Sequence, residues 1–121
     1  MTMRIEKDCL GTMEIPDESY YGIQTHRMVK VSGAAGYPVI AYPDMHRALF
    51  IIKKACALAN AEVGAMPQDV AEAIVKACDR LLNEDFSQEF PLDMWQGGGY
   101  TCVNMNVNEV IGNMANEIMT G

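Results

Sequence analysis

The sequence predicts a mainly α-helical fold, and two observations support that prediction. Apolar residues recur at steps of three and four along three separate stretches, which is the spacing of amphipathic helices. The chain has 121 residues, of which 50% are hydrophobic, so one modest domain with a real core is possible. We therefore treat residues 1–121 as a single domain, in which a short β-containing arm precedes about four helices.

The N-terminal part of the chain has no regular pattern. We expect residues 1–7 to form a strand or an extended arm, and residues 12–15 to form a brief strand or extended turn between a glycine and a proline. A short helix is expected over residues 18–31, directly after Asp17. A loop that contains glycine and proline then separates this part from the longer helices.

Two long helices are expected in the middle of the chain. Asp44 can cap the first of them, over residues 44–63, and Gly64 is well placed to end it. The second helix covers residues 67–83, where Pro67 suits the first turn.

A last helix is expected over residues 101–119, after a run of glycines. Its apolar positions lie on more than one side, so it requires neighbours on several sides. That pattern indicates a piece of a larger protein or a subunit of an oligomer.

Composition disfavours several classes of function. The formal net charge of −7 disfavours nucleic-acid binding, which needs a basic patch. No stretch approaches the roughly 18 apolar residues of a membrane span, and the N-terminal sequence MTMRIEKDCLG is too charged for a secretory signal. The simplest interpretation is a cytoplasmic protein with reduced thiols.

The cysteines give no sign of a metal site. None of them forms a CxxC pair, and their spacings are too wide for a zinc ribbon or finger. Each is expected to be a buried, inert thiol. The four cysteines are Cys9, Cys56, Cys78 and Cys102.

The most unusual stretch of the chain is QGGGYTCVNMNVNE, residues 96–109. Gly97, Gly98 and Gly99 would let the backbone approach a ligand closely, because no Cβ intervenes. A helix that begins near Thr101 would present unpaired N–H groups and its dipole to a carboxylate or phosphate, and the Thr101 hydroxyl would add a donor. A glycine-rich turn in which Thr101 only caps the helix is the alternative. The sequence matches neither a P-loop nor a dinucleotide fingerprint.

Asparagine occupies every second position from residue 104 to residue 108. Asn104 and Asn108 share a helix face, whereas Asn106 points elsewhere. If these side chains are buried, they must be hydrogen-bonded to neighbouring elements or chains. A solvated polar face is the alternative, although the apolar residues between them argue against free exposure.

Three segments together resemble the aspartase/fumarase superfamily. The segment QGGGYTCVNMNVNEVIGNMANEIM is similar to the superfamily pattern QGGAGTSxNMNxNEVIANxAxEL. The opening RIEKDCLGTMEIPDESYYGIQTHR resembles that of aspartate ammonia-lyases, and VKACDRLLNEDFSQEFPLDMWQGG resembles the approach to their first active-site motif. The resemblance covers essentially the whole chain.

The resemblance implies an enzyme that reversibly deaminates L-aspartate to fumarate and ammonia. In this family a base removes a proton beside a carboxylate, and hydrogen-bond donors stabilise the resulting enediolate. The family is homotetrameric, builds each site from three regions of different subunits, and needs no metal or organic cofactor for its core chemistry. Fumarase is the alternative within the superfamily, but three short pieces are closer to aspartases, namely Leu10-Gly11, Tyr20-Tyr21-Gly22 and Gln96-Gly97-Gly98.

The resemblance also implies which residues form the site. Thr101 matches the family threonine that contacts substrate, with Gly97, Gly98 and Gly99 shaping its loop and Asn104 supporting it from behind. Neither histidine of the chain matches a catalytic position of the family. We expect His26 and His46 to be ordinary surface or core residues, since no acidic partner lies at helical spacing.

The chain departs from the family in two respects. Tyr100 stands where the family has glycine, and Cys102 stands where serine is common, so the loop and its substrate preference are open to change. The resemblance also covers only the N-terminal domain, without the threonine–histidine region, the loop with the catalytic serine, the central helical bundle or the C-terminal domain. We therefore expect a fragment that is inactive alone and holds no catalytic residue. A helical interaction module without catalysis is the non-enzymatic alternative.

Overall fold

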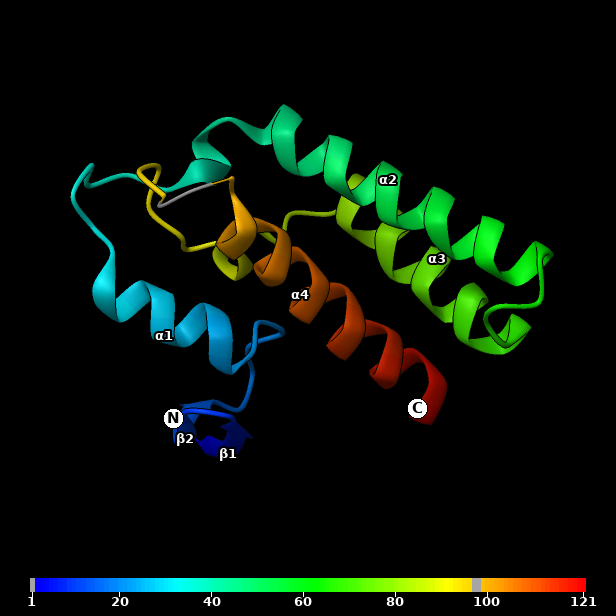
Figure 1. The fold of residues 1–121 in the computed structure, drawn as a ribbon, viewed down its shortest axis with the longest axis horizontal. Coiled ribbons are helices and arrows are strands. Elements are labelled where there is room, and N and C mark those ends of the chain that lie inside the picture. The colour runs from blue at the N-terminus through cyan, green and yellow to red at the C-terminus, as the bar shows by residue number, and fades with distance from the viewer. Residues whose placement is uncertain (1, 97–98) are drawn as a thin grey trace.

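The structure of this chain is a computed structural model, and it describes residues 2–96 and 99–121. Its fold is mainly α-helical, as predicted (Figure 1). Four helices follow a two-stranded hairpin, and two short 3-10 turns lie in the connections. The elements are β1 (Met3–Asp8), β2 (Gly11–Pro16), α1 (Ile23–Val31), η1 (Val39–Ala41), α2 (Pro43–Glu62), α3 (Gln68–Asn83), η2 (Ser87–Glu89) and α4 (Thr101–Thr120).

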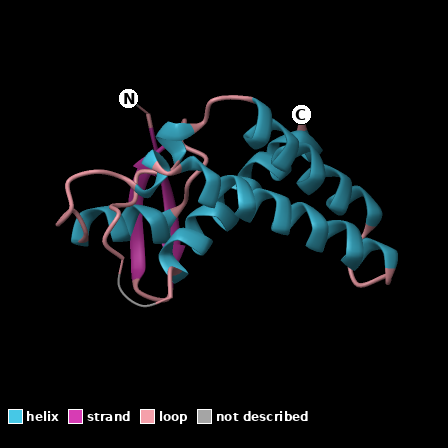
Figure 2. Ribbon diagram, turned by 90° about the horizontal axis from the view of Figure 1, so that it is seen from above, coloured by secondary structure: helices cyan, strands magenta, loops and turns pink. Residues whose placement is uncertain are grey.

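The N-terminal hairpin is antiparallel and pairs Met3 with Pro16 and Asp8 with Gly11. Both expected extended pieces are therefore strands. Two residues join them, and Gly11 takes a φ of +114°, which favours glycine. Figure 2 shows the strands at one end of the molecule, while the α2–α3 pair extends to the other.

The predicted start of the first helix at residue 18 is wrong, because α1 begins at Ile23. The backbone N–H groups of Tyr20 and Tyr21 donate to the carboxylate of Glu89, at 2.7 and 3.2 Å. A carboxylate 68 residues or more away thus satisfies donors that a longer helix would have used. Such a distant partner leaves no signal in the local pattern.

The three longer helices lie within one residue of the predicted ranges, but two end details differ. Asp44 does not cap α2, because Tyr42 is the N-cap and Pro43 takes the first helical position. Asp44 instead places negative charge in the first turn, where the helix dipole favours it. Pro67 is the N-cap of α3 rather than a first-turn residue. Gly64 follows α2 with a φ of +72°, as its predicted role requires.

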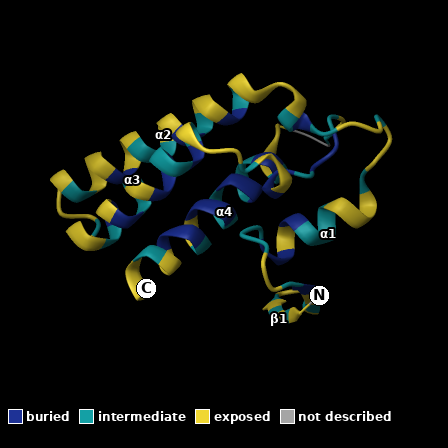
Figure 3. Ribbon diagram, turned by 180° about the vertical axis from the view of Figure 1, so that it is seen from behind, coloured by how far each residue is buried: buried dark blue, intermediate teal, exposed yellow. Residues whose placement is uncertain are grey.

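The main core lies where α2 and α3 pack against α4. Figure 3 shows buried positions along the length of α4, which contacts α3 and α2 as well as α1. The expectation that this helix has neighbours on several sides is thus met within the chain. The fully enclosed core side chains include Ala77, Cys78, Val107, Val110 and Met114.

Candidate functional site

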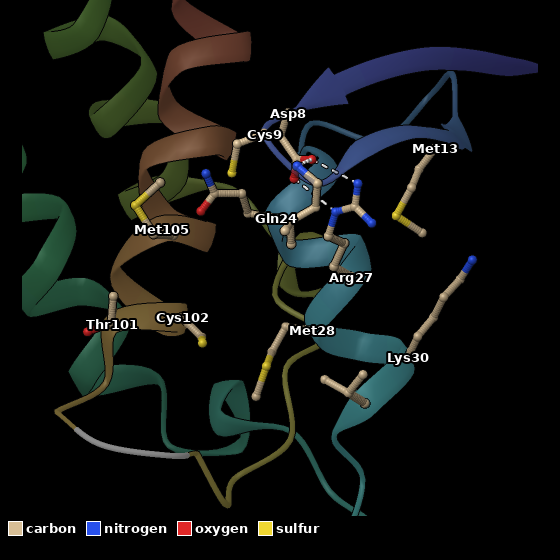
Figure 4. Close-up of a pocket in the computed structure, with 12 residues that line it drawn as sticks. Asp8, Cys9, Met13, Gln24, Arg27, Met28, Lys30, Thr101, Cys102 and Met105 are labelled. Carbon is tan, nitrogen blue, oxygen red and sulfur yellow. Dashed lines mark hydrogen bonds and ion pairs between the residues drawn. The ribbon is translucent and has the colours of Figure 1, made fainter.

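A cleft of about 630 Å³ lies between α1, the tip of the hairpin and the first turns of α4 (Figure 4). Thr101, the strongest candidate from sequence, lines this cleft. The lining residues are Thr101, Cys102 and Met105 from α4, Gln24, Arg27, Met28, Lys30 and Val31 from α1, and Asp8, Cys9, Leu10 and Met13 from the hairpin.

Thr101 is the first residue of α4, and its side chain is exposed. The N-cap is Tyr100, which makes no side-chain capping bond, so the alternative in which Thr101 serves as the cap is wrong. The first-turn N–H groups of α4, beside the exposed Thr101, can therefore meet an anion. Of the three predicted loop glycines, Gly99 has a φ of +49°, whereas Gly97 and Gly98 lie outside the described residues.

Tyr100 adopts a left-handed backbone conformation, with φ 57° and ψ 25°. Side chains with a Cβ pay roughly 1–2 kcal/mol for this conformation, and glycine does not. The departure at this position therefore strains the backbone directly before Thr101. The tyrosine ring is 41% exposed and is not among the groups that line the cleft.

The wall of the cleft that α1 provides carries two cationic side chains. Arg27 donates to both carboxylate oxygens of Asp8 at 2.8 Å, and these hydrogen bonds hold the pKa of Asp8 below its usual range. Arg27 is thus largely neutralised. Lys30 has no ion-pair partner among the described residues, so it supplies the uncompensated positive charge of this wall.

The asparagines after Thr101 differ in their surroundings. Asn106 is 1% exposed and donates from its amide to the carbonyl oxygen of Glu89 at 2.9 Å, so a buried asparagine does bond a neighbouring element. Asn104 is half-buried and lies one turn after Thr101, but its side chain is not part of the cleft wall. Asn108 is also half-buried and meets the sulfur of Met105 at 3.9 Å.

Neither histidine lines the cleft. Both were expected to be ordinary surface or core residues. His46 is 2% exposed, packs against the rings of Phe50 and Phe90, and has its pKa lowered to about 4 by burial. His26 is half-buried and stacks on Tyr21 at 6.3 Å between ring centroids. Burial and the nearby charge of Lys30 lower its pKa.

The cysteines only partly match the expectation of buried thiols. Cys78 is fully buried, and burial raises its pKa to about 11. The prediction is wrong for Cys9, which lies in the hairpin turn, and for Cys56, which lies on the outer face of α2. Cys102 is half-buried in the cleft beside Thr101.

Two further classes of site were sought in the described part of the chain. Residues 2–96 and 99–121 contain no group of three histidine, cysteine or acidic side chains that could hold a metal ion. Among the helices in these ranges, none has both the length and the apolar character for a membrane crossing.

Sequence reasoning missed the contribution of α1 to the site. Gln24, Arg27, Met28 and Val31 follow one another at steps of three, one and three, so their shared helix face could have been recognised. Their approach to Thr101, which comes 70 or more residues later, has no local signature. The cationic wall therefore emerges only from the fold.

Comparison with known proteins gives a consistent result. A family model described as "Lyase" matches residues 11–120. An aspartate ammonia-lyase from Pseudomonas aeruginosa is 50% identical over 116 residues, which are 96% of this chain and 24% of that protein. The aspartate ammonia-lyase of Escherichia coli K12 is 42% identical over 118 residues, 97% of this chain and 25% of that protein. This chain thus spans about a quarter of the length of these curated relatives.

Solved structures share the fold. A fumarate lyase:delta crystallin from Brucella melitensis, solved bound to cobalt, superposes with a TM-score of 0.94 at 40% identity. The match covers 98% of this chain and 26% of that one. A class II fumarase from Schistosoma mansoni gives a TM-score of 0.90 at 34% identity, over 98% of this chain and 25% of its own.

Proposed function

This chain belongs to the lyase family whose model matches residues 11–120, and from that premise we propose that it forms the N-terminal domain of an aspartate ammonia-lyase. The reaction is the reversible deamination of L-aspartate to fumarate and ammonia. The relatives named aspartate ammonia-lyase are 42–50% identical to this chain. The observation that carries the proposal is the placement of Thr101, at the start of α4 and on the wall of a cleft that Lys30 of α1 also lines.

The chemistry suits such a cleft. Removal of a proton beside a carboxylate produces an enediolate, which carries more negative charge on its oxygens than the substrate does. Donors already aimed at those oxygens stabilise the transition state most. We assign this task to the Thr101 hydroxyl and the first-turn N–H groups of α4, with Gly97, Gly98 and Gly99 shaping the approach and Asn104 supporting the turn.

The remaining parts of the reaction belong to the longer protein. We propose that the base that takes the proton comes from the three quarters of the relatives' length that this chain does not match, and from other subunits of a homotetramer. Neither a metal ion nor an organic cofactor has a role in the proposed step. A cytoplasmic location is part of the same proposal.

The test uses the complete lyase that carries this chain, assayed by the ultraviolet absorbance of fumarate. Thr101→Val should lower kcat/KM by about 10²–10³, which is the usual cost of losing one such donor. Thr101→Ser should retain most of the activity, because it keeps the hydroxyl. The matched control is Thr120→Val at the exposed far end of α4, which should change nothing. Full activity in Thr101→Val would contradict the assignment.

A second experiment concerns the 121 residues alone. Given L-aspartate, the isolated chain should produce no fumarate, because the proposed base lies elsewhere. Sustained turnover would show that the chain holds its own base.

Fumarase activity is the second candidate, and the match to a class II fumarase is the observation that favours it. The lower identity of that match, 34% against 42–50%, places it second. Fumarate given to the complete lyase with and without ammonia separates the two. Amination supports the first proposal, and hydration alone supports fumarase.

A further inference from the structure

Glu109 lies two turns after Thr101 on α4 and holds the first turn of α1. Its carboxylate accepts four hydrogen bonds, from the backbone N–H groups of Gly22 (3.0 Å), Gln24 (2.8 Å) and Thr25 (3.1 Å), and from the Thr25 hydroxyl (2.5 Å). Both carboxylate oxygens are used. One side chain of α4 thus satisfies most of the donors at one end of another helix.

The N-terminus of α1 depends on this outside partner. Its N-cap residue, Gly22, makes no side-chain capping bond, and its first turn contains no acidic residue. A helix end with unpaired N–H groups and a positive dipole favours a carboxylate. Glu109 supplies it from α4, and Glu6 of β1 adds a single bond to the N–H of Ile23 at 2.9 Å.

The junction between Gly22 and Glu109 is tight. A Cβ added to Gly22 would lie 2.8 Å from the nearer carboxylate oxygen of Glu109, closer than real contacts allow. The carboxylate therefore sits directly against the backbone of residue 22. This close approach fixes where α1 begins relative to α4.

The same two helices form opposite walls of the cleft. Gln24 and Arg27 come from α1, and Thr101 and Cys102 come from α4. Among the described residues of α4, Glu109 is the only one whose side chain forms hydrogen bonds to α1. Glu109 itself does not line the cleft, so it does not meet a ligand there.

We propose that Glu109 is a positioning residue, which sets the separation of Thr101 from the α1 wall of the cleft, where Lys30 carries the uncompensated positive charge. A dicarboxylate substrate has an anionic group at each end, and both groups must find their partners at a fixed spacing. Displacement of a binding group by about 1 Å can cost about 10²-fold in rate. The kinetic consequence of this role rests on the proposed function, whereas the spacing itself does not.

The kinetic test compares three variants of the complete lyase. Glu109→Ala should lower kcat/KM for L-aspartate by about 10²-fold, mainly through a higher KM. Glu109→Gln keeps the shape and one acceptor oxygen, so its KM should rise less. Glu117→Gln is the matched control, because Glu117 lies on the same helix but bonds the Tyr20 hydroxyl instead of α1. An unchanged KM with fewer active molecules would indicate a merely structural role and overturn the proposal.

A second readout does not depend on lyase activity. Each cysteine is labelled with iodoacetamide, and its labelling rate is measured by mass spectrometry. The rate of Cys102 measures access to the cleft, and the rate of buried Cys78 measures opening of the core. Exposed Cys56 gives the rate of a freely accessible thiol. In Glu109→Ala, Cys102 should react several-fold faster than in the unmodified lyase, while Cys78 stays protected.

The outcomes of the labelling are distinct. An unchanged Cys102 rate refutes the proposal, because α1 then keeps its place without Glu109. Equal acceleration of Cys102 and Cys78 also refutes it, because the whole fold has then loosened. If the unmodified lyase does not convert L-aspartate, the proposed function fails, and the labelling still decides the role of Glu109.

Discussion

The layer formed by α2, α3 and α4 and the N-terminal part of the chain are held together by different forces. In the layer, apolar side chains such as Phe50, Val107 and Met114 exclude water over a continuous core. In the N-terminal part, carboxylates and a guanidinium bind backbone groups one by one. The layer is thus held by non-directional packing, whereas the N-terminal part depends on the geometry of individual hydrogen bonds.

Arg4 and Glu89 show the second kind of stabilisation most clearly. The guanidinium of Arg4 donates to the carbonyl oxygens of Pro16, Ser19 and Tyr21 at 2.8 to 3.0 Å. Glu89 is 5% exposed and accepts from the backbone on the other side of the same segment. Side chains on both sides thus satisfy the backbone groups of a segment without regular structure. The lesson is that directional bonds place the walls of the cleft, while apolar packing supports α4 from behind.

The largest effect should come from the apolar layer. Phe90 is 2% exposed and packs on the rings of His46 and Phe50. Phe90→Ala should lower the free energy of unfolding by about 3–5 kcal/mol, because it leaves a cavity in the core. Urea unfolding of the variant measures this. Val63→Ala, at a 77% exposed position, should change it by less than about 0.5 kcal/mol. Equal effects of both changes would contradict a packed core here.

Acid should weaken the same layer. Burial lowers the pKa of His46 from 6.5 to about 4, so between these values the unfolded chain binds a proton that the native state does not. The contribution of neutral His46 to the free energy of unfolding is therefore fully present above pH 6.5, and it is lost as the pH falls towards 4. The loss at pH 4 should approach about 3 kcal/mol, at about 1.4 kcal/mol per pKa unit. Unfolding free energies measured at several pH values should show this slope, and His46→Phe should flatten it. Identical slopes would show that His46 does not titrate in this way.

A smaller effect is expected from the directional bonds. Arg4→Lys keeps the charge but replaces a planar fork of donors with a single ammonium, which cannot reach all of these carbonyl oxygens. The expected cost is about 1–2 kcal/mol, measured by thermal unfolding. Arg47→Lys is the control, because Arg47 is exposed and, among the described residues, donates to the carbonyl oxygen of Leu82 alone. If both variants melt together, the comparison between the two regions fails.

The smallest effect should be a gain. Tyr100→Gly removes the left-handed strain at the N-cap of α4, and part of this gain is offset by the greater freedom of glycine in the unfolded chain. A net stabilisation of about 0.5–1 kcal/mol is expected in urea unfolding. Tyr42→Gly is the matched control, because Tyr42 is the N-cap of α2 with a φ of −114°. That change should destabilise, and the same sign for both would contradict the strain.

The two regions also differ in how far the sequence predicts them. The ends of α2, α3 and α4 follow from local signals, such as the apolar periodicity and Gly64, and these were confirmed within about one residue. The predicted start of α1 was wrong, because the backbone before its first turn bonds Glu89 and the first turn itself bonds Glu109, both of which are 68 residues or more away. Distant side chains that bond backbone groups leave no periodic trace.

The residues of the candidate site also differ in how far the sequence predicts their positions. Thr101 could be placed at the start of a helix from the glycines before it, and the structure puts it there. Arg27 and Lys30 could not be assigned to the same cleft, because α1 reaches α4 only through the fold. The sequence therefore predicts the wall of the cleft that the start of α4 provides, but it does not predict the wall that α1 provides.

The contact between Gly22 and Glu109 also has an evolutionary consequence. A methyl group at position 22 collides with the carboxylate at position 109, so an alanine there requires the Glu109 side chain to move. The constraint joins two positions that are 87 residues apart in the chain. Among descendants of this sequence, an alanine at position 22 should appear only in lineages that have first shortened or lost the acid at position 109.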